Sequence, residues 1–109
     1  RAEKIQKKAR KAGFDWPDVS GALDKLSEEV EELRTAVAEG SNIQEELGDL
    51  LFAAVNVSRF VQVDPEDALH RACDKYQGRF RRVADAADRP LNAYTEAEKI
   101  ALWEQAKEN

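Results

Sequence analysis

Residues 47–61 read LGDLLFAAVNVSRFV, and this stretch decides the fold class. Its apolar residues are spread almost all the way round a helix of 3.6 residues per turn, so the stretch is expected to be a buried helix. Asp49 and Asn56 interrupt it, and they share one stripe because they are seven positions apart. An ionised Asp in such a helix needs a partner, which can be a cationic side chain, a metal ion or an interface.

Capping and turn signals on either side of this stretch divide the chain into helical segments. Gly40 ends one segment, and Asn42 with Glu45 has the spacing of a capping box that starts the next. Thr95 and Glu98 form a second capping box near the end of the chain. The predicted helices span residues 2–12, 18–39, 43–63, 65–87 and 95–107. No segment shows sustained period-2 alternation, so we predict an all-α fold in which the second, third and fourth helices form a bundle.

Two acidic motifs flank the turn between the second and third predicted helices. They are EEVEE at residues 28–32 and EELGD at residues 45–49. Glu29 with Glu32, and Glu46 with Asp49, are three positions apart and therefore lie on one helix face each. The short turn makes the two helices antiparallel, so the two pairs can face each other. Four converging carboxylates suit Mg²⁺, Mn²⁺ or Ca²⁺, although acidic runs on helices are more often solvated faces.

A basic stripe follows on the fourth predicted helix, at spacings of four, four and three residues: Arg71, Lys75, Arg79 and Arg82. Such a face can clamp phosphate oxygens or can simply be solvated and paired with acids. Trp103 and Lys107 lie four apart on the last helix, where Trp can stack on a base and Lys can reach a phosphate. Trp103, and Trp16 in the turn near the N-terminus, are equally well explained as packing residues.

Single residues carry expectations of their own. Gly48 costs about 1 kcal/mol against Ala in the middle of a helix, which predicts a close helix approach or a tight site there. Cys73 falls on an apolar stripe of the fourth helix and is expected in the core, whereas His70 is expected at the surface.

Composition limits the classes of protein that fit. A chain of 109 residues forms one small domain, and an all-α chain this short often shares its core with a partner subunit. The net charge of −5 disfavours binding to a nucleic-acid polymer. One cysteine excludes an internal disulfide, and no apolar run is long enough for a membrane span, so we expect a cytoplasmic protein. The chain starts at Arg1 without any Met, which suggests a piece of a longer chain.

Taken together, these blocks resemble the MazG nucleotide pyrophosphohydrolases, particularly their C-terminal catalytic domain. The resemblance covers nearly the whole chain, since it includes RAEKIQKKARKAGFDWPDV at 1–19, EEVEE at 28–32, EELGDLLFAAVN at 45–56, the segment 75–82 and Trp103 with Lys107. Tyr76 and Gly78 depart from the family, in which these positions are often Phe and a longer polar residue.

The resemblance implies a single MazG-like catalytic domain over residues 1–109. It implies a homodimer whose helices complete each other's site, with broad activity on NTPs and dNTPs and a house-cleaning role. The Mg²⁺ ligands that it implies are Glu29, Glu32, Glu46 and Asp49. The phosphate or nucleotide contacts that it implies are Lys75, Arg79, Trp103 and Lys107.

The expected reaction is metal-assisted hydrolysis of a nucleoside triphosphate to the monophosphate and pyrophosphate. Glu28 or Glu45 is the candidate that removes the proton from water, and Asn56 joins the candidate substrate-binding residues. Three alternatives stay open. They are an enzyme specific for dUTP or phosphoribosyl-ATP, a non-catalytic helical dimerisation or regulatory module, and a di-iron bundle, which the single His70 disfavours.

Overall fold

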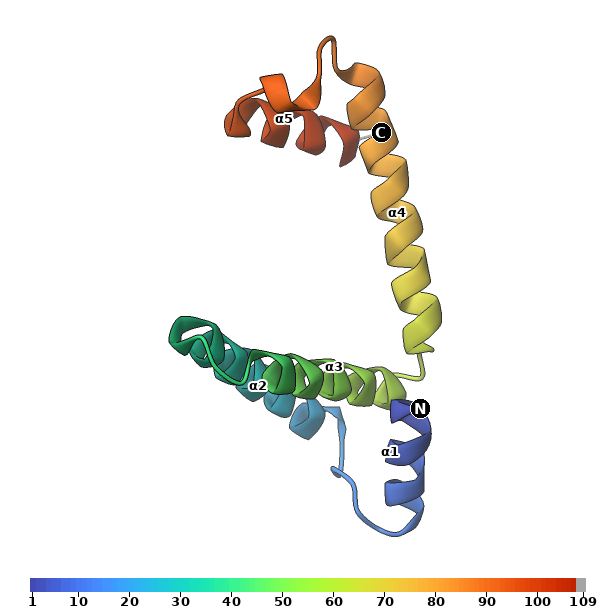
Figure 1. Ribbon diagram of the computed structural model, residues 1–109. Helices are drawn as coiled ribbons and strands as arrows, with labels where there is room; N and C mark the ends of the chain where they lie inside the picture. The colour runs from blue at the N-terminus through green and yellow to red at the C-terminus, as the bar shows by residue number, and fades with distance from the viewer. Residues whose placement is uncertain (108–109) are drawn as a thin grey trace. The chain divides into compact units, whose positions relative to one another are not determined.

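The computed structural model describes residues 1–107, and all of their regular secondary structure is helical (Figure 1). The elements are α1 (Ala2–Lys11), α2 (Val19–Glu39), α3 (Ile43–Phe60), α4 (Pro65–Ala86), the short 3₁₀ helix η1 (Leu91–Ala93) and α5 (Glu96–Lys107). The predicted all-α class is therefore confirmed, and η1 is the element that the sequence did not predict. Within these residues, none of the helices combines the length and the apolar character of a membrane span.

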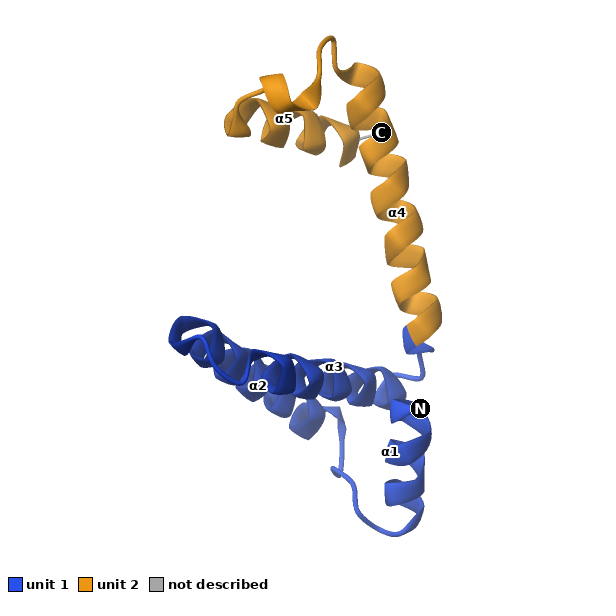
Figure 2. Cartoon of the chain, viewed as in Figure 1, with its two compact units in different colours: residues 1–65 blue, residues 66–109 orange. Residues whose placement is uncertain are grey.

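The chain divides into two compact units, Arg1–Pro65 and Glu66–Asn109 (Figure 2). In the first unit, α2 and α3 pack side by side and α1 contacts α3. Gly40 makes the reversal between α2 and α3 possible, because its φ of 70° lies in the left-handed region that favours glycine. The side-chain amide of Gln6 ties α1 to α3 by donating to the Phe52 carbonyl at 2.9 Å.

The start of α3 differs from the prediction. Asn42 does not form a capping box with Glu45, because its side chain makes no cap hydrogen bond. The physical reason is the backbone conformation of Asn42, whose φ of 57° lies in the left-handed region. A residue whose side chain caps a helix normally has an extended backbone.

The end of α3 also differs, since the helix stops at Phe60 and not at Val63. Gln62 adopts a φ of 61°, the Gln62 N–H donates to Arg59 O, and the Val63 N–H donates to Ser58 O. This pair of bonds is a Schellman motif. The apolar residues after Phe60 therefore belong to the helix stop, although their pattern suggested further helix.

The second unit contains most of α4 together with η1 and α5. The predicted capping box of α5 is confirmed, since the Thr95 N–H donates to Glu98 Oε1 at 2.8 Å and the Glu98 N–H donates to Thr95 Oγ1 at 3.2 Å. Helices α4 and α5 meet where Arg82 donates to the Ala106 carbonyl at 3.0 Å. The Tyr76 and Trp103 rings also meet there, with centroids 5.2 Å apart.

The core of the described residues is small. Its buried hydrophobic side chains are Ala22, Ala36, Ala53, Val83 and Ala106. The expectation that α3 is buried on most of its surface was wrong for the single chain, because Leu47, Leu51 and Phe52 are exposed. A helix pair leaves its outer faces open unless further helices cover them.

Two further expectations were wrong. Cys73 is exposed and does not belong to the core. For Gly48, the expected close helix approach was wrong, because a Cβ there would meet nothing within 4 Å, whereas the alternative of a site at this glycine stays a prediction. His70 is exposed as expected, and its Nε2 lies 3.6 Å from Asp74.

Candidate functional site

The acidic motifs of α2 and α3 meet in the first unit. Glu29, Glu46 and Asp49 each offer a carboxylate oxygen, and these oxygens all lie within 4.8 Å of one another. The three residues differ in burial: Glu29 is buried, Glu46 is half-buried and Asp49 is exposed. The expectation of a buried Asp49 was therefore wrong. We call Glu29, Glu32, Glu46 and Asp49 the acid cluster.

Two oxygens of the acid cluster are buried without a hydrogen-bond partner among the described residues, Glu29 Oε2 and Glu46 Oε2. A buried polar atom left without a partner costs about 1–3 kcal/mol, and more when it is charged. A hard divalent cation such as Mg²⁺ binds carboxylate oxygens, and one or two carboxylates per ion are usual. The donor set and its unpartnered oxygens therefore fit such an ion.

Glu32, the fourth predicted ligand, is exposed on α2 and is not among the three residues whose carboxylate oxygens all lie within 4.8 Å of one another. The charge of Glu29 is the main cause that raises the pKa of Glu32, followed by desolvation and by hydrogen bonding with Glu46. Carboxylates repel each other in this way when no cation lies between them. The raised pKa shows that Glu32 belongs electrostatically to the same group as Glu29 and Glu46.

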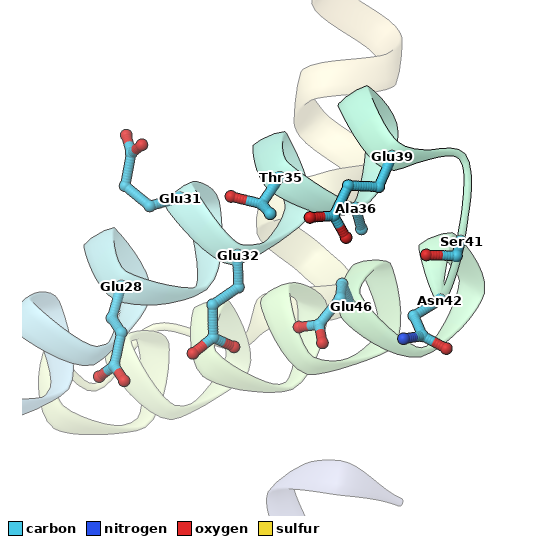
Figure 3. Close-up of a pocket in the computed structure, with 9 residues that line it drawn as sticks. All are labelled: Glu28, Glu31, Glu32, Thr35, Ala36, Glu39, Ser41, Asn42 and Glu46. Carbon is cyan, nitrogen blue, oxygen red and sulfur yellow. The ribbon is translucent and has the colours of Figure 1, made fainter.

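An open pocket of about 520 Å³ adjoins the acid cluster near the turn between α2 and α3. Figure 3 shows the carboxyl groups of Glu28 and Glu32 extending from α2 toward α3, whereas Glu31 extends away. Glu28 is thus placed beside the acid cluster. Glu45, the other candidate proton acceptor, is exposed in the first turn of α3 and lies outside the lining of this pocket.

Lys25 is a residue of the site that the sequence reasoning missed. Its Nζ lies 3.0 Å from Glu29 Oε1 and 3.6 Å from Glu28 Oε2. Hydrogen bonding to Glu29 is the first cause that raises the pKa of Lys25. The signal was present in the sequence, because Lys25 precedes Glu29 by four residues and such pairs meet on a helix surface. Lys25 neutralises part of the charge of the acid cluster.

A second cavity, of about 680 Å³, starts at the acid cluster and extends to α1 and the turn at residues 12–18. Asn56 lines it, and the Asn56 Oδ1 accepts hydrogen bonds from Arg59. Arg59 also forms a two-bond ion pair with Asp15, with Nη2–Oδ1 at 2.7 Å and Nη1–Oδ2 at 3.0 Å. The Arg59 hydrogen bonds are the main cause that lowers the pKa of Asp15. Sequence reasoning missed this pair too, although an Arg within an apolar helix needs a partner as much as Asp49 does.

The remaining predicted contacts lie in the second unit. The Arg79 guanidinium lies 5.8 Å from the centroid of the Trp103 ring, so α4 and α5 bring these two predicted residues together. Lys107 is exposed and lies 3.3 Å from Glu104. Lys75 occupies the turn of α4 before Arg79, whereas Arg71 pairs with Asp67 at 2.9 Å.

Comparison with known proteins adds a family. The profile of the MazG nucleotide pyrophosphohydrolase domain matches residues 18–84. The chain is 41% identical over 109 residues to the nucleoside triphosphate pyrophosphohydrolase/pyrophosphatase MazG of Thermotoga maritima, covering 97% of this chain and 42% of that protein. It is 37% identical over 114 residues to the nucleoside triphosphate pyrophosphohydrolase of Escherichia coli K12, covering 98% of this chain and 43% of that protein.

The chain thus spans about two fifths of the length of these relatives. The matched residues 18–84 include all of α2 and α3, and hence the whole acid cluster. On this match and these identities, the chain belongs to the MazG nucleotide pyrophosphohydrolase family.

Proposed function

We propose that the chain is a Mg²⁺-dependent nucleoside triphosphate pyrophosphohydrolase, which cleaves NTPs and dNTPs to the monophosphate and pyrophosphate. One observation carries the proposal: in the part of the chain that the structure describes, Glu29 Oε2 and Glu46 Oε2 are buried without a hydrogen-bond partner, beside Asp49 and between two helices. Stability alone does not explain such an arrangement, because it costs folding free energy. The relatives named above, which carry this activity in their names, support the same reading.

Glu29, Glu32, Glu46 and Asp49 would hold the cation, and Mn²⁺ would be able to replace Mg²⁺ because it takes the same oxygen ligands. When bound, the ion supplies positive charge that orients the triphosphate and stabilises its developing negative charge. Glu28 is the better placed proton acceptor for the attacking water, since it lines the pocket beside the acid cluster and Glu45 does not.

The nucleotide contacts proposed in addition are Asn56, Lys75, Arg79, Trp103 and Lys107. Arg79 and Trp103 support this assignment, because their contact on α4 and α5 offers a cation and a ring to one ligand. A cationic side chain and an aromatic ring are the groups that a phosphate and a base require.

The test is incubation with each NTP and dNTP in the presence of Mg²⁺, followed by identification of the products. Pyrophosphate and the monophosphate are expected, and chelation of the cation should stop their release. Orthophosphate as the product would refute the reaction class. A strong preference for dUTP would replace the broad enzyme by the base-specific alternative, and no turnover with any nucleotide would favour the regulatory module.

We propose further that two copies of the chain associate. The exposed apolar residues of α2 and α3 recur at spacings of seven and four: Leu23, Val30 and Val37, and Ile43, Leu47 and Leu51. No large side chain among residues 1–107 is fully buried, so the core of one copy alone is too small for a stable domain. A second copy would cover these stripes with its own.

The mass in solution tests the association. Light scattering should give twice the chain mass, and Leu51→Glu should shift it toward one copy because it places a charge on the covered stripe. A wild-type chain that remains a single copy at high concentration would contradict the dimer.

A house-cleaning role in the cytoplasm is the setting we propose for this enzyme.

A further inference from the structure

The basic residues that the sequence places on one stripe of α4 have different partners. Lys75 and Arg79 are proposed nucleotide contacts, and the Arg79 guanidinium lies 5.8 Å from the centroid of the Trp103 ring. Arg82 instead donates from Nη1 to the carbonyl oxygen of Ala106 in α5, at 3.0 Å. The hydrogen bond of Arg82 therefore joins α4 to another helix, and Arg82 has no part in the proposed nucleotide contacts.

The Ala106 carbonyl is a suitable partner for an arginine because it lies in the last turn of α5. The last four carbonyls of a helix have no partner within the helix, and a cation there also meets the negative end of the helix dipole. A hydrogen bond from an ionised donor is stronger than one between neutral groups. Arg82 therefore fixes the end of α5 to α4.

Trp103 lies on the same face of α5 as Ala106, because residues three apart are neighbours on a helix. Arg79 and Arg82 have the same spacing on α4. The Trp103 ring meets the Tyr76 ring there, with centroids 5.2 Å apart. The Arg82 hydrogen bond and the contacts of the Trp103 ring are thus successive points of one junction, and the place of the ring depends on the end of α5.

The start of α5 is held by a separate group of residues. Arg89 donates to Glu98 Oε2 in the first turn of α5 at 2.8 Å, and its guanidinium lies 3.8 Å from the centroid of the Tyr94 ring. The Tyr94 hydroxyl donates to Asp88 Oδ1 at 2.8 Å. Loss of the Arg82 hydrogen bond should therefore loosen the last turns of α5 and leave its start attached.

We propose that Arg82 is a positioning residue, which sets the place of Trp103 and Lys107 through the Ala106 carbonyl and does not itself bind phosphate. The proposal rests on the proposed function, because it requires Trp103 and Lys107 to contact the nucleotide. Loss of a contact that binds substrate and transition state equally raises KM and leaves kcat unchanged. This split between KM and kcat is therefore expected when Arg82 is replaced.

The first measurement is the kinetics of ATP hydrolysis by the whole chain with Mg²⁺. Arg82→Met removes the donor and keeps a long side chain that is compatible with a helix. It should raise the KM about threefold to tenfold, as for loss of one net hydrogen bond, and leave kcat unchanged. Arg82→Gln, which is shorter, should behave in the same way. Arg81→Met is the matched control, since Arg81 is an exposed arginine of the same helical turn off the stripe, and it should change neither constant.

A second measurement separates positioning from direct binding of a phosphate. The background is a chain that lacks both proposed contacts of α5, with Trp103→Ala and Lys107→Ala together. Adding Arg82→Met to this background should raise the KM no further, because Arg82 acts through α5. A further rise of the same size as in the wild type would show that Arg82 binds the substrate itself, and it would overturn the proposal.

The place of Trp103 is also measured without nucleotide, by quenching of its fluorescence with acrylamide. The chain has two tryptophans, so the measurement uses a Trp16→Phe chain in which Trp103 alone emits. Arg82→Met should raise the quenching constant, because the ring loses its fixed place against Tyr76, whereas Arg81→Met should not. A thermal unfolding curve for each variant checks that it folds.

Two further results would overturn the positioning role: an unchanged quenching constant in Arg82→Met, or an unchanged KM for ATP in both Arg82 variants. A wild-type chain that releases no pyrophosphate would instead refute the proposed function. The quenching measurement needs no turnover, so the two failures are distinguishable.

Discussion

Two carboxylate sites lie in the same unit, and they differ in how their charges are satisfied. The Asp15 carboxylate receives two hydrogen bonds from Arg59, and these lower its pKa. Among residues 1–107, Lys25 is the cationic partner that the acid cluster has, and the buried oxygens Glu29 Oε2 and Glu46 Oε2 have no hydrogen-bond partner. The pKa of Glu32 is raised, mainly by the charge of Glu29. The described residues supply hydrogen-bond partners to the first site, whereas they leave buried oxygens of the second site without any.

We propose that this difference distinguishes an acid that stabilises the fold from acids that bind a ligand. A carboxylate with a full set of donors stabilises the fold, and its removal exposes a buried guanidinium. Carboxylates that repel each other lower the free energy of unfolding. A cation that binds between them raises it again, because it binds the folded chain. Substitutions in the acid cluster should therefore lower the rate of hydrolysis, whereas substitution of Asp15 should lower the stability of the fold.

The largest effect is expected at the acid cluster. Asp49→Asn should lower kcat/KM for NTP hydrolysis by at least about 100-fold, since even residues that only support metal ligands cost 10- to 100-fold. The melting temperature without metal should not fall, because the substitution removes a repelling charge. Asp24→Asn is the matched control, as an exposed acid on α2 outside both cavities, and should leave turnover unchanged. Full activity in Asp49→Asn would show that the charge of Asp49 is not needed for hydrolysis, and it would contradict the proposed difference between the two sites.

The opposite pattern is expected at Asp15. Asp15→Asn should destabilise the fold by about 2 kcal/mol, between the values for exposed and for buried ion pairs. The intermediate value follows from the environment, because the side chain of Asp15 is 15% exposed and that of Arg59 is 4% exposed. Urea unfolding measures the loss. A variant as stable as the wild type would show that the pair contributes nothing to the fold.

The pH dependence of stability sharpens the same contrast. The pKa of Asp15 is lower in the folded chain than its ordinary value, so its contribution is fully present above an unfolded pKa of about 3.9. It is lost as the pH falls through the lowered folded value. Urea unfolding between pH 5 and pH 2 should therefore show a shallower acid loss in Asp15→Asn than in the wild type. Parallel curves for the two chains would contradict the assignment.

A smaller effect is expected in the second unit, at the capping box of α5, whose hydrogen bonds are made within the chain and whose side chains are exposed. Thr95→Ala should cost about 1 kcal/mol, because it removes the Oγ1 that accepts from the Glu98 N–H at the start of α5. Hydrogen exchange of the first turn of α5 should report the loss locally. Unchanged exchange there would show that the capping box does not stabilise the helix start.

The sequence predicted those features that depend on local spacing. Helical periodicity gave the five long helices, and the spacing of three within each acidic pair gave the carboxyl groups that meet between α2 and α3. The stop of α3 was missed because the left-handed backbone of Gln62 has no signal in an apolar run. The Asp15–Arg59 pair was missed because it joins residues 44 positions apart, and long-range pairing depends on tertiary packing.

The central claim is that the acid cluster is incomplete without a divalent cation. The most direct measurement is the melting temperature of the wild type and of Glu29→Gln as Mg²⁺ is raised at constant ionic strength, without nucleotide. The wild type should gain stability with each increase, by about 2.7 kcal/mol at 100 times the dissociation constant, and Glu29→Gln should gain far less. Equal gains in the two chains, or no gain in either, would contradict a cation site between α2 and α3.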